Sequence, residues 1–173
     1  MKKIFNQEIR FKDDNSNDFP DWEEKRLGDI SNVIMGQSPS SSSYNQNGLG
    51  VPLIQGNADI KDRKTKPRQW TTEPTKLCKL NDLILSVRAP VGNISISHHE
   101  ACIGRGVCSI KFKKGNSNSF LYQFLLWFEP KWKSLEQGST FTSVNSNDIK
   151  SIKLNNPTQL EQEKISKFLS SID

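Results

Sequence analysis

Short apolar runs separated by polar turns occupy the first two thirds of the chain, and they are typical of strands. Residues 51–54 (VPLI) and 83–87 (LILSV) are largely apolar runs of strand length. Residues 93–97 and 107–112 alternate polar and apolar side chains, which predicts strands buried on one face. Residues 30–35 are also short, apolar and strand-like at their end. A sheet is therefore expected in this region.

The pattern changes to a helical period late in the chain. Between residues 118 and 128 apolar side chains recur at helical spacing, and Ser117 stands where an N-cap belongs. Pro130 is expected to end this helix because proline lacks a backbone N–H, and residues 131–136 are expected to form a second short helix. A short turn is expected at residues 148–149. Strands followed by helices predict a mixed α+β fold.

A last helix is predicted for residues 159–173. Thr158 and Glu161 fit a capping box, in which each side chain accepts a hydrogen bond from the backbone amide of the other residue. The apolar positions have two interpretations: a surface helix folded onto its own domain, or a seam for a partner helix, because three of them are spaced three and four apart. The candidates for a partner or dimer helix are Leu160, Ile165, Phe168, Leu169 and Ile172.

These elements divide the chain into three parts. Residues 1–21 form a polar arm rich in Asn and Asp, residues 22–156 form one domain, and residues 157–173 form the last helix. Trp22 and Leu27 are the first expected core side chains.

Composition narrows the class of protein. The 173 residues are 34% hydrophobic and 25% charged, which is a foldable balance. The formal net charge of +5 favours a polyanionic partner. Three cysteines without paired spacing predict a reducing, cytoplasmic environment. No stretch approaches about eighteen apolar residues, so no membrane-spanning helix is expected.

Motifs that carry chemistry are missing from the sequence. The two histidines and the neighbouring cysteines have no common zinc spacing, so no metal site is expected. Ser109 stands where a dinucleotide-binding loop starting at Gly104 has its third glycine. Residues 155–158 (NNPT) only partly match the Asn-Pro-Pro-Tyr motif of adenine methyltransferases, and no glycine-rich cofactor loop accompanies them. Catalysis by this chain is therefore not expected.

Seven stretches are each weak motifs, but their order and spacing together are specific. They are residues 19–30 (FPDWEEKRLGDI), 36–44 (GQSPSSSSY), 51–56 (VPLIQG), 82–92 (DLILSVRAPVG), 103–106 (IGRG), 138–141 (GSTF) and 157–165 (PTQLEQEKI). Through them residues 19–173 resemble the specificity (S) subunit of type I restriction-modification systems. The resemblance covers one target-recognition domain and the start of a conserved helix.

The resemblance implies a non-catalytic protein that reads double-stranded DNA. Full-length members of the family hold a pair of recognition domains. Long helices separate and follow these domains, form an antiparallel coiled coil between two half-sites, and dock the modification subunits. S-adenosylmethionine and ATP are then expected only on the modification and restriction subunits, and no cofactor on this chain. Helix 159–173 would be the first part of that spacer. The chain would be a fragment, or a half subunit that forms a homodimer through this helix.

Candidates for DNA contact come from basic and polar stretches. Residues 61–68 hold five basic groups, beginning with Lys61, which suit phosphates. The loops at 37–47 and 140–145 hold amide and hydroxyl groups, which suit base edges. The candidates are Gln37, Ser38, Ser40, Ser41, Tyr44, Arg63, Lys64, Lys66, Arg68, Arg88, Arg105, Thr140, Thr142 and Ser143.

Each assignment has a plainer alternative. The basic stretch can be a solvated loop, the polar loops can be flexible connections, and Arg88 or Arg105 can brace a turn through carbonyl hydrogen bonds. For the whole protein, one alternative is a free-standing DNA-binding or regulatory protein without a modification partner. Another is a self-sufficient methyltransferase, which the missing motifs disfavour.

Overall fold

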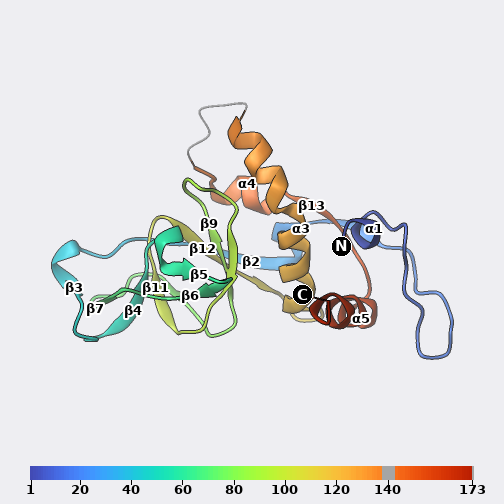
Figure 1. Ribbon diagram of the computed structural model, residues 1–173, viewed down its shortest axis with the longest axis horizontal. Helices are drawn as coiled ribbons and strands as arrows, with labels where there is room; N and C mark the ends of the chain where they lie inside the picture. The colour runs from blue at the N-terminus through green and yellow to red at the C-terminus, as the bar shows by residue number, and fades with distance from the viewer. Residues whose placement is uncertain (138–142, 173) are drawn as a thin grey trace.

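The computed structural model describes residues 1–137 and 143–172, with side chains up to Trp132 and again from Ser143. The two sheets that contain β4 and β12 extend toward one end of the molecule, and helices α1, α3, α4 and α5 gather at the other (Figure 1). This mixture of sheets and helices confirms the predicted α+β class.

The larger sheet has six strands and is built around β12. This strand pairs antiparallel with β2 on one side and with β9 on the other, and β9 pairs in turn with β10. The β5–β6 hairpin completes the sheet through a parallel pairing of β6 with β10. The strands in spatial order are β2 (Ser31–Met35), β12 (Val107–Phe112), β9 (Leu83–Ser86), β10 (Ile94–Ile96), β6 (Lys64–Thr65) and β5 (Ile60–Lys61).

The smaller sheet has five strands and packs against the larger one. Ile54 and Ile103 of the smaller sheet and Ile84 and Val107 of the larger one are fully buried in one shared apolar cluster. This cluster fixes the two sheets to each other. The strands in spatial order are β3 (Tyr44–Asn45), β7 (Gln69–Thr71), β4 (Val51–Ile54), β11 (Ala101–Ile103) and β8 (Leu77–Cys78).

Helix α3 (Asn118–Gln137) packs against β10 and β12 of the larger sheet and supplies much of the main core. Phe120, Leu121 and Phe124 are buried there. The Ser117 hydroxyl accepts a hydrogen bond from the Phe120 amide at 3.3 Å, which confirms the expected N-cap. The apolar stripe read from the sequence is thus the face that meets the sheet.

Helix α3 continues through Pro130, so the predicted break and the separate helix at residues 131–136 are wrong. Proline removes one backbone hydrogen bond, but packing on both sides holds the turn. Trp132 is buried beside Gly92, and its ring centroid lies 5.4 Å from that of Phe128. Tertiary contacts therefore override the local preference.

A small two-stranded sheet and two short helices connect the larger parts. Asn145 caps helix α4 with its side chain, where the sequence indicated only a turn. The 3₁₀ turns η1 (Ser41–Ser43) and η2 (Asn57–Asp59) lie within the connections of the sheets. The remaining elements are β1 (Glu23–Arg26), which pairs antiparallel with β13 (Lys153–Asn156), and the helices α2 (Leu27–Ile30) and α4 (Ser146–Lys150).

The core begins earlier in the chain than Trp22, which the sequence indicated as its first side chain. Helix α1 (Lys2–Phe5) places Ile4 and Phe5 in the main core, where the Phe5 ring stacks on that of Trp127 at 5.2 Å between centroids. The division into arm, domain and spacer helix stays a prediction.

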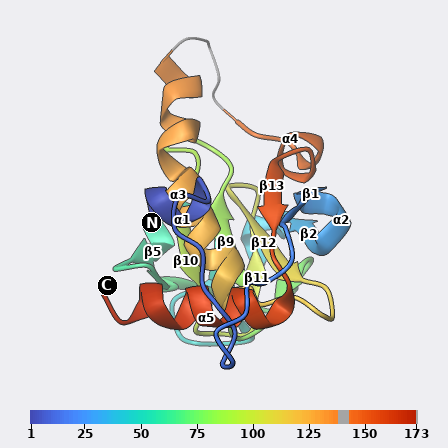
Figure 2. The same ribbon diagram turned by 90° about the vertical axis from the view of Figure 1, so that its right-hand side faces the viewer.

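Helix α5 (Gln159–Ser170) lies across the beginning of α3 (Figure 2). Ile165 and Leu169 are fully buried in the chain's own core, so these two side chains do not face a partner as the seam spacing suggested. Three other apolar side chains of the segment keep exposed fractions of 67% for Leu160, 46% for Phe168 and 62% for Ile172. The surface-helix interpretation therefore holds for Ile165 and Leu169, and a partner at the three exposed side chains stays a prediction.

Candidate nucleic-acid interface

Three chain segments converge where the two sheets meet. The Gln37 amide donates to the Ile103 carbonyl at 2.8 Å, and the Gly104 amide donates to the Ile54 carbonyl at 2.8 Å. The Gly106 amide donates to the Gln55 carbonyl at 3.0 Å. These backbone bonds hold the ends of β2, β4 and β11 at fixed distances from one another.

Glycine permits this close approach. A Cβ atom at Gly36 would collide with the Gly104 carbonyl oxygen, and one at Gly106 would collide with the Gln55 carbonyl oxygen. No side chain therefore lies at the point where the three segments meet, and the neighbouring side chains surround it.

An open pocket of about 490 Å³ lies above this convergence. It brings together five side chains that the sequence identified separately, namely Gln37, Ser38, Ser41, Tyr44 and Arg105. Pro39 and Gln55 complete its lining. The loop after β2 and the loop between β11 and β12 are therefore parts of one surface.

Hydrogen bonds fix the side chains at the rim. The Arg105 amide donates to the Ser38 hydroxyl at 3.1 Å, and that hydroxyl donates to Gln55 Oε1 at 3.4 Å. The Tyr44 hydroxyl donates to the Pro39 carbonyl at 3.1 Å. Because Ser38 engages the carbonyl oxygen of the Gln55 amide, the amide NH₂ group stays available as a donor.

Arg105 is exposed, and only its backbone serves the fold. Within residues 1–137 and 143–172 its guanidinium has no hydrogen-bond or ion-pair partner. An unengaged guanidinium beside an amide and several hydroxyls combines the groups that recognise base edges in the major groove.

Ser40 lies beside this pocket rather than in its lining. Its hydroxyl is 2.8 Å from that of Ser42. The neighbouring Ser43 hydroxyl donates to the Ser40 carbonyl and lies 2.7 Å from the Thr71 hydroxyl of β7. The serine-rich segment is thus tied to the smaller sheet and is not a free connection.

The basic stretch forms the β5–β6 hairpin, and its arginines are engaged within the protein. Arg63 forms an ion pair with Glu129 of α3 at 2.9 Å and also donates to the Ile94 carbonyl. Arg68 forms an ion pair with the buried Asp59 at 2.9 Å. Among the described residues, the exposed side chains of Lys64 and Lys66 have no such partner.

Arg88 and Ser143 lie opposite each other in an isolated antiparallel bridge. The Val144 amide donates to the Val87 carbonyl at 2.9 Å beside this bridge. The two candidates are therefore neighbours in space, although they lie 55 positions apart in the sequence. Thr140 and Thr142 lie outside the described residues.

Sequence reasoning missed Gln55, although it had the signal. This residue directly follows a well-predicted strand within the stretch VPLIQG. Where the end of one strand lies beside the ends of other strands, its next side chain can reach a pocket that they share.

The described residues offer little chemistry of other kinds. They contain no group of three or more His, Cys, Asp or Glu side chains that could hold a metal ion. None of their helices is both long and apolar enough to cross a membrane. All three cysteines are buried free thiols, and burial raises the pKa of Cys108 to about 12.

Comparison with known proteins adds a family to this geometry. A family model described as the type I restriction modification DNA specificity domain matches residues 20–173. The putative type I restriction enzyme MjaX specificity subunit of Methanocaldococcus jannaschii is 39% identical, and the alignment covers 100% of this chain and 43% of that protein.

Two solved structures are also similar. The HsdS subunit from Thermoanaerobacter tengcongensis has a TM-score of 0.80 at 34% identity, covering 88% of this chain and 37% of that one. A chain from work on the complex assembly and conformational transition of the type I R-M system has a TM-score of 0.82 at 32% identity, covering 99% and 43%. This chain therefore spans less than half the length of these relatives.

Proposed function

Because the chain belongs to the type I restriction modification DNA specificity family, we propose that it reads one short half-site of a bipartite DNA target and presents that DNA to a modification subunit. The observation that carries the proposal is the pocket shared by residues 37–44, Gln55 and Arg105.

The pocket suits base readout because it gathers several donor groups, and hydrogen bonds hold the Gln55 and Tyr44 side chains and the Arg105 backbone in place before DNA arrives. The Arg105 guanidinium can donate to guanine O6 and N7, and the Gln55 NH₂ group can donate to a base acceptor. Ser41 and Tyr44 add hydroxyl groups at the same rim. Preorganised donors lose less conformational freedom on binding than flexible ones do.

Affinity would come from phosphate contacts outside the pocket. The ammonium groups of Lys61, Lys64 and Lys66 in the basic stretch have no partner in the described part of the chain. The formal net charge of +5 favours the approach of DNA in general. Base discrimination and overall affinity should therefore respond to different substitutions.

Catalysis and cofactor binding are assigned to other subunits. In this proposal S-adenosylmethionine and ATP bind the modification and restriction subunits, and this chain contributes recognition alone. The relatives matched are named specificity subunits, which supports this division. A chain covering 43% of such a relative fits the reading of a single half-site.

A selection from randomised DNA duplexes tests the reading of a half-site. The purified chain should enrich one short motif at moderate salt, while unenriched duplexes bind more weakly and with similar salt dependence. A folded chain that retains duplexes without enriching any motif would contradict base reading.

Delivery to a modification subunit needs a separate experiment. Cells that express this chain with such a subunit should gain adenine methylation at sites containing the selected motif, as mapped by single-molecule sequencing. Selective DNA binding without new methylation, and without binding of the purified modification subunit, would instead support the free-standing DNA-binding protein.

A further inference from the structure

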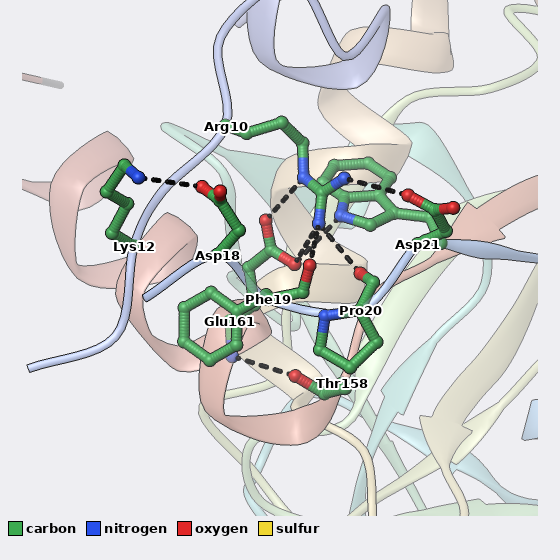
Figure 3. Close-up of polar contacts among 9 residues, drawn as sticks. Arg10, Lys12, Asp18, Phe19, Pro20, Asp21, Thr158 and Glu161 are labelled. Atoms are coloured by element: carbon green, nitrogen blue, oxygen red, sulfur yellow. Dashed lines mark hydrogen bonds and ion pairs between the residues drawn. The ribbon is translucent and has the colours of Figure 1, made fainter. Parts of the chain in front are cut away.

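The first turn of helix α5 buries a carboxylate that belongs to a three-residue network. Glu161 has no exposed surface, and its side chain accepts from Arg10 at 2.9 and 3.1 Å (Figure 3). The Trp22 indole N–H donates to the same carboxylate at 2.9 Å. The capping box predicted that this carboxylate accepts a hydrogen bond from the Thr158 amide. It instead accepts from Arg10 and Trp22, which lie more than 130 positions away in the sequence.

Arg10 joins both ends of residues 10–22, which we term the strap, to the helix. Its Nη2 atom donates to the carbonyl of Pro20 at 2.8 Å and to that of Phe19 at 3.3 Å (Figure 3). The guanidinium lies 5.5 Å from the centre of the Trp22 ring. The Glu161 hydrogen bond raises the pKa of Arg10, so this cation stays charged throughout the working pH range.

The strap then follows one stripe along α5. Lys164 Nζ lies 2.6 Å from the Asp14 carboxylate and donates to the Lys12 carbonyl at 2.8 Å. One turn further on, the rings of Phe168 and Phe11 are 5.5 Å apart. The helix positions 161, 164 and 168 are three and four apart, so they lie on one face.

A second polar anchor holds the helix to the rest of the domain. Gln162 is fully buried, and its carbonyl oxygen accepts from the Ser117 amide at 2.8 Å. Its amide group donates to the Pro157 carbonyl at 2.9 Å. Ile165 and Leu169 continue this attachment in the main core. The helix is thus held between the domain and the strap.

The network of Arg10, Glu161 and Trp22 is better suited to fixing the orientation of helix α5 than to adding binding energy. A buried carboxylate is costly unless all its lone pairs are engaged, and apolar side chains could cover the same face at lower cost. An apolar contact, however, tolerates rotation and sliding of a helix. A guanidinium fork on a carboxylate admits essentially one relative geometry, which the Trp22 hydrogen bond fixes further.

We infer that Arg10, Glu161 and Trp22 are positioning residues that clamp helix α5 at one angle to the DNA-reading end of the molecule. The inference rests on the proposed function, in which partner subunits assembled along this helix must stand in a defined place relative to the half-site. Helix α5, held by the strap, would then keep the partner at a fixed position relative to the pocket.

Distance measurement between two spin labels tests the clamp in the full chain. One label is introduced by Ser170→Cys at the end of α5 and the other by Lys76→Cys beside β8, because both positions are exposed. The native cysteines are buried and should not compete for the label. Wild type should give one narrow distance distribution.

Arg10→Gln should broaden or shift that distribution, while Lys12→Gln should not. Both changes remove one positive charge from the strap, but the Lys12 side chain pairs with the exposed Asp18 at 2.9 Å, and the backbone carbonyl of Lys12 that meets Lys164 is retained. Binding of the selected half-site should stay within about twofold of wild type for both variants, because distant sites act independently. An Arg10→Gln distribution identical to that of wild type would overturn the inference.

Arg10→Lys separates geometry from charge and serves if Arg10→Gln does not fold. It keeps the cation but loses the fork, so it should also broaden the distribution in a chain that melts cooperatively. A narrow wild-type distribution for Arg10→Lys would contradict the orienting role. Failure of the wild type to select any DNA motif would refute base reading instead. The distance measurement would still show whether Arg10 fixes the angle of helix α5.

Discussion

Arg63 and Arg105 look alike in the sequence but serve different purposes in the fold. Arg63 directs its guanidinium inward to Glu129 and to the Ile94 carbonyl. Arg105 uses only its backbone amide, which donates to Ser38. The sequence placed both among the DNA contacts. Of the two, only Arg105 lines the pocket, and its guanidinium has no partner in the described part of the chain.

Lys64 and Lys66 should contribute affinity without specificity. Replacing both by Gln is expected to weaken binding to every duplex and to reduce the slope of log K against log salt by roughly 0.9 for each phosphate that the protein no longer neutralises. Fluorescence anisotropy between low and moderate salt measures this slope. Equal slopes for the double variant and wild type would remove the hairpin from the interface.

Arg63→Gln should act on stability instead. It leaves the Glu129 carboxylate, which is 8% exposed, without its charged partner, at a cost of roughly 1–3 kcal/mol in the free energy of unfolding. Urea denaturation measures the change. The matched control is Lys153→Gln, which breaks an exposed ion pair with Glu24 and should cost less than about 1 kcal/mol. Equal losses for the two variants would contradict the bracing role of Arg63.

Helix α5 depends on its cap as well as on its burial. The Thr158 hydroxyl accepts from the Glu161 amide at 3.5 Å, a long contact, so Thr158→Ala should cost roughly 0.5–1 kcal/mol of unfolding free energy. Thr158→Ser retains the acceptor and should remain near wild type. Thermal unfolding of the three proteins compares them, and a Ser variant as unstable as the Ala variant would argue against capping.

Elements with a clear period could be predicted, and the shortest ones could not. Strands β9 and β12 and the part of helix α3 before Pro130 follow the apolar pattern closely. Strands β6 and β8 have two residues each, which is too few to show an alternation. They exist because neighbouring strands pair with them, and a local pattern does not encode this.

Spacing also left the role of helix α5 undecided. Ile165 and Leu169 belong to the core and Phe168 to the surface, although all fit the same three-and-four pattern. Five of the pocket's side chains were candidates from the sequence because polar loops and glycine-flanked arginines suit DNA, but Gln55 was not among them. Their convergence depends on hydrogen bonds between segments about 70 positions apart, such as that from the Gln37 amide to the Ile103 carbonyl.

The molecule as a whole places the pocket of Gln37, Gln55 and Arg105 on the sheets and the strap on the helices. Two apolar clusters support these parts, a large one that includes α3 and α5 and a small one between the sheets. Cys108 belongs to the large cluster and Cys78 to the small one. The thiols therefore report on the integrity of both.

Thiol labelling should follow global unfolding. Burial raises the pKa of Cys108 to about 12, above the value of about 8.5 for an unfolded thiol. Between about pH 8.5 and 12 the folded state therefore keeps the thiol proton while the unfolded state loses it, so the free energy of unfolding falls as the pH rises through this range.

At pH 8 a disulfide reagent should label the native chain only as fast as it unfolds. Rapid labelling of the native chain would show that the cores open locally.

The central claim is that the pocket reads bases. Its most direct test compares the motif selected from randomised duplexes by wild type with those selected by Gln55→Ala and Arg105→Ala. Each variant should lose roughly tenfold discrimination at one or two base pairs and keep the rest of the motif and the salt dependence. If both variants select the wild-type motif with undiminished preference at every position, the pocket does not read the half-site.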